Sequence, residues 1–340
     1  MKKYFTGSIL GLFSLLLSIP ALGQKEVADS LTIIGIQYHD EGNYDMAIKY
    51  YKKALKKDPN SVLIFYEMSM TYMYNGNYSK SIRYADKVID QKQDYSIEAL
   101  EIKASCLDYL GKPQEALDMY AEVEKLRGPN NMLYYNMALV HFKLEQIDSA
   151  IVLLEKGIQM NPGHPSSHLV LAYANQSKGR ASQSAMGFAF FLMLESQTER
   201  SKDAVSGMFS SYFGNISSSE GGTQINISLP NSNDSSVFST TDVILSLMAA
   251  SIYNNEELSD YQKLKDVYSM MMDNLNKDET SYADLYGTLY YQVLAPIESS
   301  DHYEAFLRFI TQSSLAESED WLGAHPQEVE ALFAWISAEN

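Results

Sequence analysis

Residues 31–59 read LTIIGIQYHDEGNYDMAIKYYKKALKKDP, and this stretch decides the fold. Apolar residues recur three and four positions apart on both sides of the run Gly42 to Tyr44. This spacing predicts two amphipathic helices joined by a tight turn. Gly35 and Ala47 are small enough to let the two helices approach closely. Pro59 ends the unit, because proline cannot continue the interior of a helix.

The turn glycine recurs along the chain at a nearly fixed interval. Gly42, Gly76, Gly111 and Gly179 are separated by 34, 35 and 68 residues, and Glu145 stands where the missing glycine is expected. A period of this size is typical of stacked helical repeats, in which each unit buries its apolar face against its neighbours. The sequence therefore predicts a protein that binds another molecule, without indicating which one.

The pattern closely resembles the tetratricopeptide repeat. The first unit matches it at Leu31, Ile34, Gly35, Tyr38, Gly42, Asn43, Tyr44, Ala47, Ile48, Tyr51, Ala54, Leu55 and Pro59. The resemblance covers about half the chain and implies an all-α fold: a right-handed α-solenoid of about five helix-turn-helix repeats, followed by a C-terminal helical module. The fifth unit is the least regular, because His168 and Asn175 occupy positions that are usually apolar. The repeats are predicted within residues 24–198, near 28–61, 62–95, 97–130, 131–164 and 165–198.

The segment 1–23 is predicted to be a secretory signal peptide. Two lysines precede a short apolar run, and Ala21 and Gly23 are the small residues that a signal peptidase prefers. Cleavage after Gly23 would leave Gln24 first and make the net charge more negative, from −17 to −19, since Lys2 and Lys3 are lost. We therefore expect a periplasmic or secreted protein without a membrane span, with a retained signal anchor as the alternative. The acidic surface disfavours nucleic-acid binding.

The chain beyond residue 198 keeps no 34-residue period. We expect a capping helix at 199–213, then a connection rich in Ser, Asn and Gly at 214–239 that contains a short strand around Ile225, Ile227 and Leu229. A helical module is predicted at 240–340. Its tyrosines at 282, 286 and 290 lie on one stripe, which favours core packing over a ligand-facing surface. The helices are predicted near 241–254, 257–275, 281–295, 302–313 and 326–337.

The resemblance also implies a binding groove, because the first helix of each tetratricopeptide unit lines a concave surface that receives a peptide. These helices are apolar on both faces in units two and four, which an exposed helix cannot sustain without a covering partner. The predicted groove residues are Tyr66, Met70, Met73 and Tyr74 in unit two, Tyr109 in unit three, Met132, Tyr135, Asn136, Leu139, Phe142 and Lys143 in unit four, and Tyr173 in unit five.

The chemistry of this groove favours an apolar partner. Family members that grip a peptide's C-terminal carboxylate use Lys, Arg and Asn, whereas this chain has Glu67, Glu98, Glu101 and Asp108 nearby. A groove rich in methionine and aromatic residues suits an apolar helix or extended peptide, because methionine adapts to varied shapes. The covering is either an external segment or the C-terminal helices themselves; we expect an open groove with a C-terminal cap.

No catalytic, cofactor or metal motif is recognisable in the sequence. His164 and His168 are four residues apart, but Pro165 separates them and no third ligand stands nearby. Cys106 falls within a repeat helix, where a small buried thiol is ordinary. The chain is therefore expected to be a non-catalytic scaffold for a protein or peptide, similar to exported tetratricopeptide proteins of Bacteroidota. The alternative is a glycan binder or enzyme with a site between the repeats and the C-terminal module.

Overall fold

The computed structural model describes residues 9–219, 222–226, 237–275 and 284–339. Its contacts divide the chain into two compact units, Met1–Pro129 and Asn130–Asn340. Within the described residues both units are helical, except for one two-stranded hairpin in the second. The expectation of an essentially all-α repeat protein with a helical C-terminal module is confirmed.

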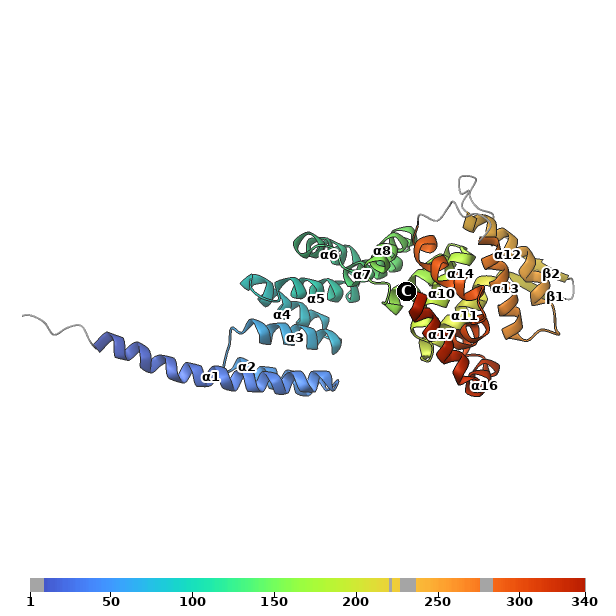
Figure 1. The fold of residues 1–340 in the computed structure, drawn as a ribbon. Helices are drawn as coiled ribbons and strands as arrows, with labels where there is room; N and C mark the ends of the chain where they lie inside the picture. Colours follow the sequence, from blue (N-terminus) through green and yellow to red (C-terminus); the bar gives the residue numbers. More distant parts are fainter. Residues whose placement is uncertain (1–8, 220–221, 227–236, 276–283, 340) are drawn as a thin grey trace, which may run out of the picture. The chain divides into compact units, whose positions relative to one another are not determined.

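The first unit consists of three successive helix pairs. Its helices are α1 (Ile9–Asp40), α2 (Tyr44–Leu55), α3 (Val62–Tyr74), α4 (Tyr78–Gln91), α5 (Ser96–Tyr109) and α6 (Pro113–Arg127). Each helix packs mainly against its neighbours in sequence, as stacked repeats require. The first half of α1 extends beyond the other helices of this unit (Figure 1). Residues 9–23 of the predicted signal peptide lie in this part of α1, and residues 1–8 fall outside the described residues.

The turns between paired helices share one backbone conformation. Gly42, Gly76, Gly111 and Gly179 have φ between 69° and 74°, the left-handed region that glycine adopts without strain. Glu145 has φ 58°, so the fourth turn keeps the same conformation without glycine. Its backbone N–H donates to the carbonyl of Phe142 (3.0 Å), as that of Gly76 donates to the carbonyl of Met73 (3.0 Å). The fourth turn is therefore formed like the others, with glutamate in place of glycine.

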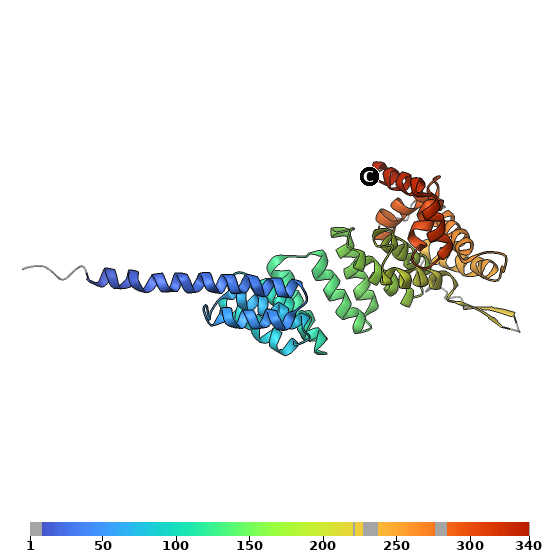
Figure 2. The ribbon, with the colours of Figure 1, turned by 90° about the horizontal axis from the view of Figure 1, so that it is seen from below.

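The second unit contains two further helix pairs, a following helix and the C-terminal module. The repeat helices and the following helix are α7 (Asn131–Lys143), α8 (Ile147–Met160), α9 (Pro165–Ser177), α10 (Ala181–Leu194) and α11 (Glu199–Phe213). The strands β1 (Ile216–Ser219) and β2 (Gly222–Ile225) pair antiparallel, with Ile216 opposite Ile225. This hairpin projects away from the helices of its unit (Figure 2). Ile227 and Leu229, predicted to lie in a strand, are outside the described residues.

The C-terminal module contains more helical segments than the sequence predicted. It consists of α12 (Val237–Tyr253), α13 (Asp260–Leu275), the π-helix η1 (Tyr286–Tyr291), α14 (Gln292–Glu298), α15 (Tyr303–Thr311), α16 (Ala316–Ala324) and α17 (Pro326–Glu339). The short helix α16 was missed, and the segment predicted near 281–295 is a π-helix that continues into α14. Residues 281–283 of that segment lie outside the described residues.

One hydrophobic core joins the last repeats to this module. It contains buried residues of every helix from α7 to α10 and continues through α11, α12 and α13 to Leu332 of α17. The helix α10 lies at its centre, in contact with α9, α11, α12, α15 and η1. Ten residues of α10 are buried, which an amphipathic repeat helix would not allow. The module is therefore an integral part of the second unit.

The two irregular polar positions of the fifth repeat hold the module in place. The hydroxyl of Tyr290 donates to Nδ1 of His168 (2.7 Å), and Nε2–H of His168 donates to the carbonyl of Pro162 (2.7 Å). Nδ2 of Asn175 donates to the hydroxyl of Tyr286 (2.6 Å). Buried polar groups need such partners, because an unpaired one costs about 1–3 kcal/mol. Tyr286 and Tyr290 are both buried, which confirms core packing for these two; Tyr282 lies outside the described residues.

A carboxylate of the module also caps a repeat helix. The backbone N–H groups of Ala181 and Ser182, at the start of α10, donate to the carboxylate of Asp242 in α12 (3.1 and 2.7 Å). The residue before α10, Arg180, supplies no side-chain cap of its own. A carboxylate at a helix N-terminus satisfies the unpaired amides and interacts favourably with the helix dipole. Asp242 therefore ties the module to the beginning of α10.

Candidate functional site

In the first unit, the predicted groove residues lie on α3 and at the end of α5. Tyr66, Met70 and Met73 are partly exposed, and they follow one face of α3 at helical spacing. Tyr74 and Tyr109, the last residues of their helices, are each 59% exposed. These two tyrosines occupy equivalent positions in consecutive repeats, so the same edge of the unit presents an aromatic ring twice.

Each of these tyrosines stacks on a second tyrosine of the first unit. The ring centroids of Tyr74 and Tyr44 are 6.1 Å apart, and those of Tyr109 and Tyr78 are 4.8 Å apart. The partner in both pairs is the first residue of the preceding repeat's second helix. Stacking holds the rings in place while much of each Tyr74 and Tyr109 side chain remains exposed to solvent.

Acidic side chains accompany these aromatic residues, but they differ in environment. Glu67 of α3 is buried and accepts a hydrogen bond from the Tyr51 hydroxyl (3.4 Å), and burial raises the pKa of its carboxyl. Glu98 and Glu101 of α5 both pair with Arg127 of α6. Glu67 therefore belongs to the interior, and the arginine partly neutralises the other two.

In the second unit, the predicted groove residues lie on α7 and α9 and surround an apolar hollow. Its volume is about 460 Å³. Leu139, Phe142 and Tyr173 were predicted from the sequence; Val170, Gln176 and Ser177 of α9 were missed. Val170 lies one helical turn before Tyr173, so the same spacing argument could have identified it. Two turns of α7 thus face two turns of α9 across a surface that is mostly hydrocarbon.

The remaining predicted residues of α7 are solvent-accessible around this hollow. Met132 is 44% exposed, Lys143 is exposed and Asn136 is partly exposed. Tyr135 packs edge-on against the His164 ring, with centroids 5.1 Å apart. None of the twelve predicted groove residues is buried. The C-terminal module leaves those of the second unit accessible, and its contacts with α9 involve the buried His168 and Asn175 instead.

The two histidines considered as metal ligands have other partners. Both ring nitrogens of His168 are hydrogen-bonded, and burial lowers its pKa to about 4, so the ring is neutral at physiological pH. Nδ1 of His164 hydrogen-bonds the Ser167 hydroxyl (2.8 Å). Cys106 is buried beside the Ser81 hydroxyl, and burial raises the pKa of its thiol. Within the described ranges, no group of three His, Cys, Asp or Glu side chains could hold a metal ion.

The arrangement suits the binding of another molecule. An accessible apolar hollow can take hydrophobic side chains of another molecule, and exposed stacked tyrosines can contact a partner at low entropic cost.

Among the helices that the structure describes, none is long and apolar enough to cross a membrane.

Comparison with protein families identifies the repeats independently of the geometry. Models of the tetratricopeptide repeat match residues 28–61 and 50–83, and a model of the N-terminal tetratricopeptide region of Psidin matches residues 70–191. These matches together run from the first predicted repeat through most of the fifth.

Curated and solved relatives each match part of the chain. Lipopolysaccharide assembly protein B of Escherichia coli K12 is 26% identical over 164 residues, which cover 47% of this chain and 42% of that protein. The chain thus spans less than half the length of this relative. The crystal structure of MamA is 30% identical and covers 48% of this chain and 94% of its own, with a TM-score of 0.42. The crystal structure of PilW, a type IV pilus biogenesis factor, is 17% identical with a TM-score of 0.49. The match covers 71% of this chain and 98% of PilW. The matched repeats and the helix pairs that they form show that this chain is a tetratricopeptide repeat protein.

Proposed function

We propose that this chain is an exported, non-catalytic scaffold that binds an apolar segment of a partner protein or peptide through its predicted groove residues. The observation that carries the proposal is the hollow of about 460 Å³ between α7 and α9. It opens on the helices that line the binding surface in a tetratricopeptide array, and its walls are mostly apolar. Export is supported by the basic, apolar and small-residue pattern of residues 1–23.

The partner's chemistry follows from that of the surface. The hollow is lined by the apolar residues Leu139, Phe142 and Val170. A partner that fills it needs one or two large apolar side chains, close enough together to enter a single hollow. The chain carries 43 acidic against 26 basic residues, so basic residues flanking those anchors would speed association. The partner segment is therefore an apolar helix or extended peptide with positively charged flanks.

The hollow can be tested with a matched pair of substitutions in the second unit. Leu139→Asp places a charge in the hollow, whereas Val152→Asp places one on α8 at a residue that is 49% exposed. Nile red, an apolar dye, should lose most of its fluorescence enhancement with Leu139→Asp and keep it with Val152→Asp. Equal enhancement in both variants would show that the hollow is not the accessible apolar surface.

The partner itself can be sought by crosslinking in the native cell envelope. We expect a specific crosslinked protein with the wild-type chain and with Val152→Asp, and its loss with Leu139→Asp. A peptide from that protein should then bind the purified chain with the same dependence on Leu139. A crosslinked product that persists in Leu139→Asp would contradict the proposal.

A further inference from the structure

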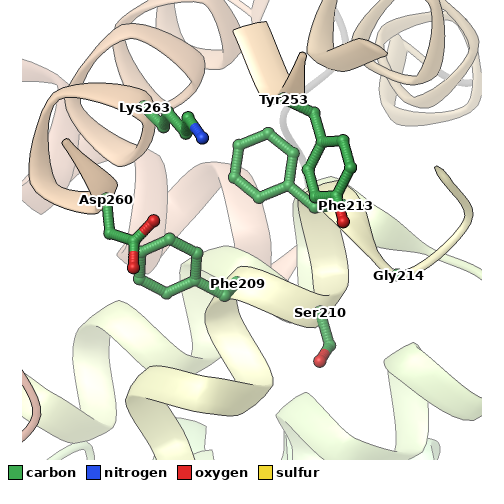
Figure 3. A pocket seen from close by; sticks show the side chains of 7 residues that line it. All are labelled: Phe209, Ser210, Phe213, Gly214, Tyr253, Asp260 and Lys263. Atoms are coloured by element: carbon green, nitrogen blue, oxygen red, sulfur yellow. The ribbon is translucent and has the colours of Figure 1, made fainter. Parts of the chain in front are cut away.

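A second hollow, of about 250 Å³, lies where α11 meets α12 and α13 (Figure 3). It shares no residue with the hollow between α7 and α9. Its volume lies just below the range of sites for drug-sized ligands, so it suits one small ring rather than a long chain. The lining residues are Phe209, Ser210, Phe213, Gly214, Tyr253, Asp260 and Lys263.

Three aromatic rings form one side of this hollow. Phe209 and Phe213 lie one turn apart on α11, with ring centroids 6.0 Å apart, and Tyr253 at the end of α12 is 5.9 Å from Phe213. Phe213 is anchored in the core, whereas Tyr253 is 40% exposed. An aromatic platform that is fixed on one side and open on the other can stack against the C–H face of a ligand.

Two opposite charges complete the site. Asp260 and Lys263 stand on the first turn of α13, and Figure 3 shows the carboxylate and the ammonium directed toward the space beside the phenylalanine rings. Neither side chain forms an ion pair or hydrogen bond with another described residue. The Lys263 ammonium lies 5.9 Å from the centroid of the Tyr253 ring. The Asp260 carboxylate and the Lys263 ammonium can therefore both form hydrogen bonds with a ligand.

The charge pattern selects the class of ligand. A cation would be attracted by Asp260 but repelled by Lys263, and an anion the reverse, so a net charge on the ligand brings little electrostatic gain. A hydroxyl group can both accept from an ammonium and donate to a carboxylate. We infer that this hollow binds one pyranose ring of a neutral sugar, whose C–H face stacks on the aromatic rings while neighbouring hydroxyls contact Asp260 and Lys263.

Saturation-transfer NMR on the full chain tests this site with defined probes: the methyl pyranosides of glucose, galactose, mannose, N-acetylglucosamine, fucose and rhamnose. At least one should receive saturation, most strongly at the ring protons of one face. Tyr253→Ala should weaken its binding about fivefold, through lost stacking. Asp260→Ala should weaken it about tenfold, through the lost charged hydrogen bond. Both residues are exposed, and tryptophan fluorescence verifies that the variants are folded.

Controls separate this site from the proposed protein-binding hollow. Leu139→Asp should leave sugar binding unchanged, and Tyr253→Ala should leave the Nile red signal unchanged. The inference is overturned if none of the six pyranosides receives saturation, or if binding is the same in Tyr253→Ala and Asp260→Ala. It is also overturned if the zwitterion phenylalanine or the cation choline binds at these residues and the neutral sugars do not.

Discussion

The helices α4 and α10 occupy the same place in their repeats, and both contain fourteen residues, yet they differ in burial. Three residues of α4 are buried, against ten of α10. The helix α4 packs mainly against α3 and α5, whereas α10 is also covered by helices of the C-terminal module. The number of faces that a repeat helix must make apolar is thus set by the number of elements that cover it.

The largest effect that tests this comparison is expected from Phe188→Ala in α10. The Phe188 ring is fully buried, packs edge-on against Tyr173 at 4.9 Å and lies against Gly207 of α11, so its removal leaves a cavity. The loss should be about 3–5 kcal/mol in the free energy of unfolding of the second unit. Urea denaturation followed by the fluorescence of Trp321 and Trp335 measures it, since both tryptophans of the chain lie in that unit.

The matched control is Val152→Ala on the exposed side of α8, which should change stability by less than about 0.5 kcal/mol. A cost below about 1 kcal/mol for Phe188→Ala would mean that α10 is not buried between α9 and α11 as described.

A smaller effect is expected from acid, through His168. Burial lowers the pKa of His168 from 6.5 to about 4. Between these values the unfolded chain binds the proton and the folded chain does not. The stability of the second unit should therefore decrease as the pH falls from about 6.5 to about 4, by at most about 3 kcal/mol. The urea midpoint of tryptophan fluorescence, measured across this range, reports the decrease.

His168→Phe separates this contribution from the carboxyl groups. Burial raises the pKa of Glu155, so its contribution has the opposite sign and is present in both proteins. The variant should be less stable at pH 7, because Tyr290 and Pro162 lose a partner, and its stability should change less between pH 6.5 and 4. Parallel pH profiles for the two proteins would exclude His168 as the source.

The smallest effect extends the comparison to the turns. Four of them have glycine at positive φ, while Glu145 adopts the same conformation with a side chain. Glu145→Gly should raise the free energy of unfolding by about 1 kcal/mol, because the strain of the left-handed conformation is relieved. Glu145→Ala removes the carboxylate but keeps the strain, so it should bring no gain. Thermal denaturation that fails to separate the two variants would refute this account.

The repeats could be predicted because their signals are local. The register of Gly42, Gly76 and Gly111 assigned each helix its faces, and the left-handed turns confirm the spacing. The register also indicated that Leu139, Phe142 and Tyr173 share a surface. It could not provide the size of the hollow, because this depends on how closely α7 and α9 approach.

The second hollow illustrates the opposite case. Phe209 and Phe213 are one turn apart and could be paired from the sequence, but Tyr253 and Lys263 reach them only through the packing of α12 and α13 on α11. Nothing local to residues 253–263 indicates that they belong beside α11.

The sequence by itself determined the repeat period, the turn conformation and the apolar faces of the first helices, because each depends on residues within one unit of about 34. Only the tertiary structure decided why the fifth repeat carries His168 and Asn175. Their partners, Tyr290 and Tyr286, lie 122 and 111 residues away, and a hydrogen bond over that separation leaves no periodic pattern. The two polar residues that make the fifth repeat irregular are therefore the ones that hydrogen-bond the C-terminal module. Buried polar groups need such a partner, because an unpaired one destabilises the fold.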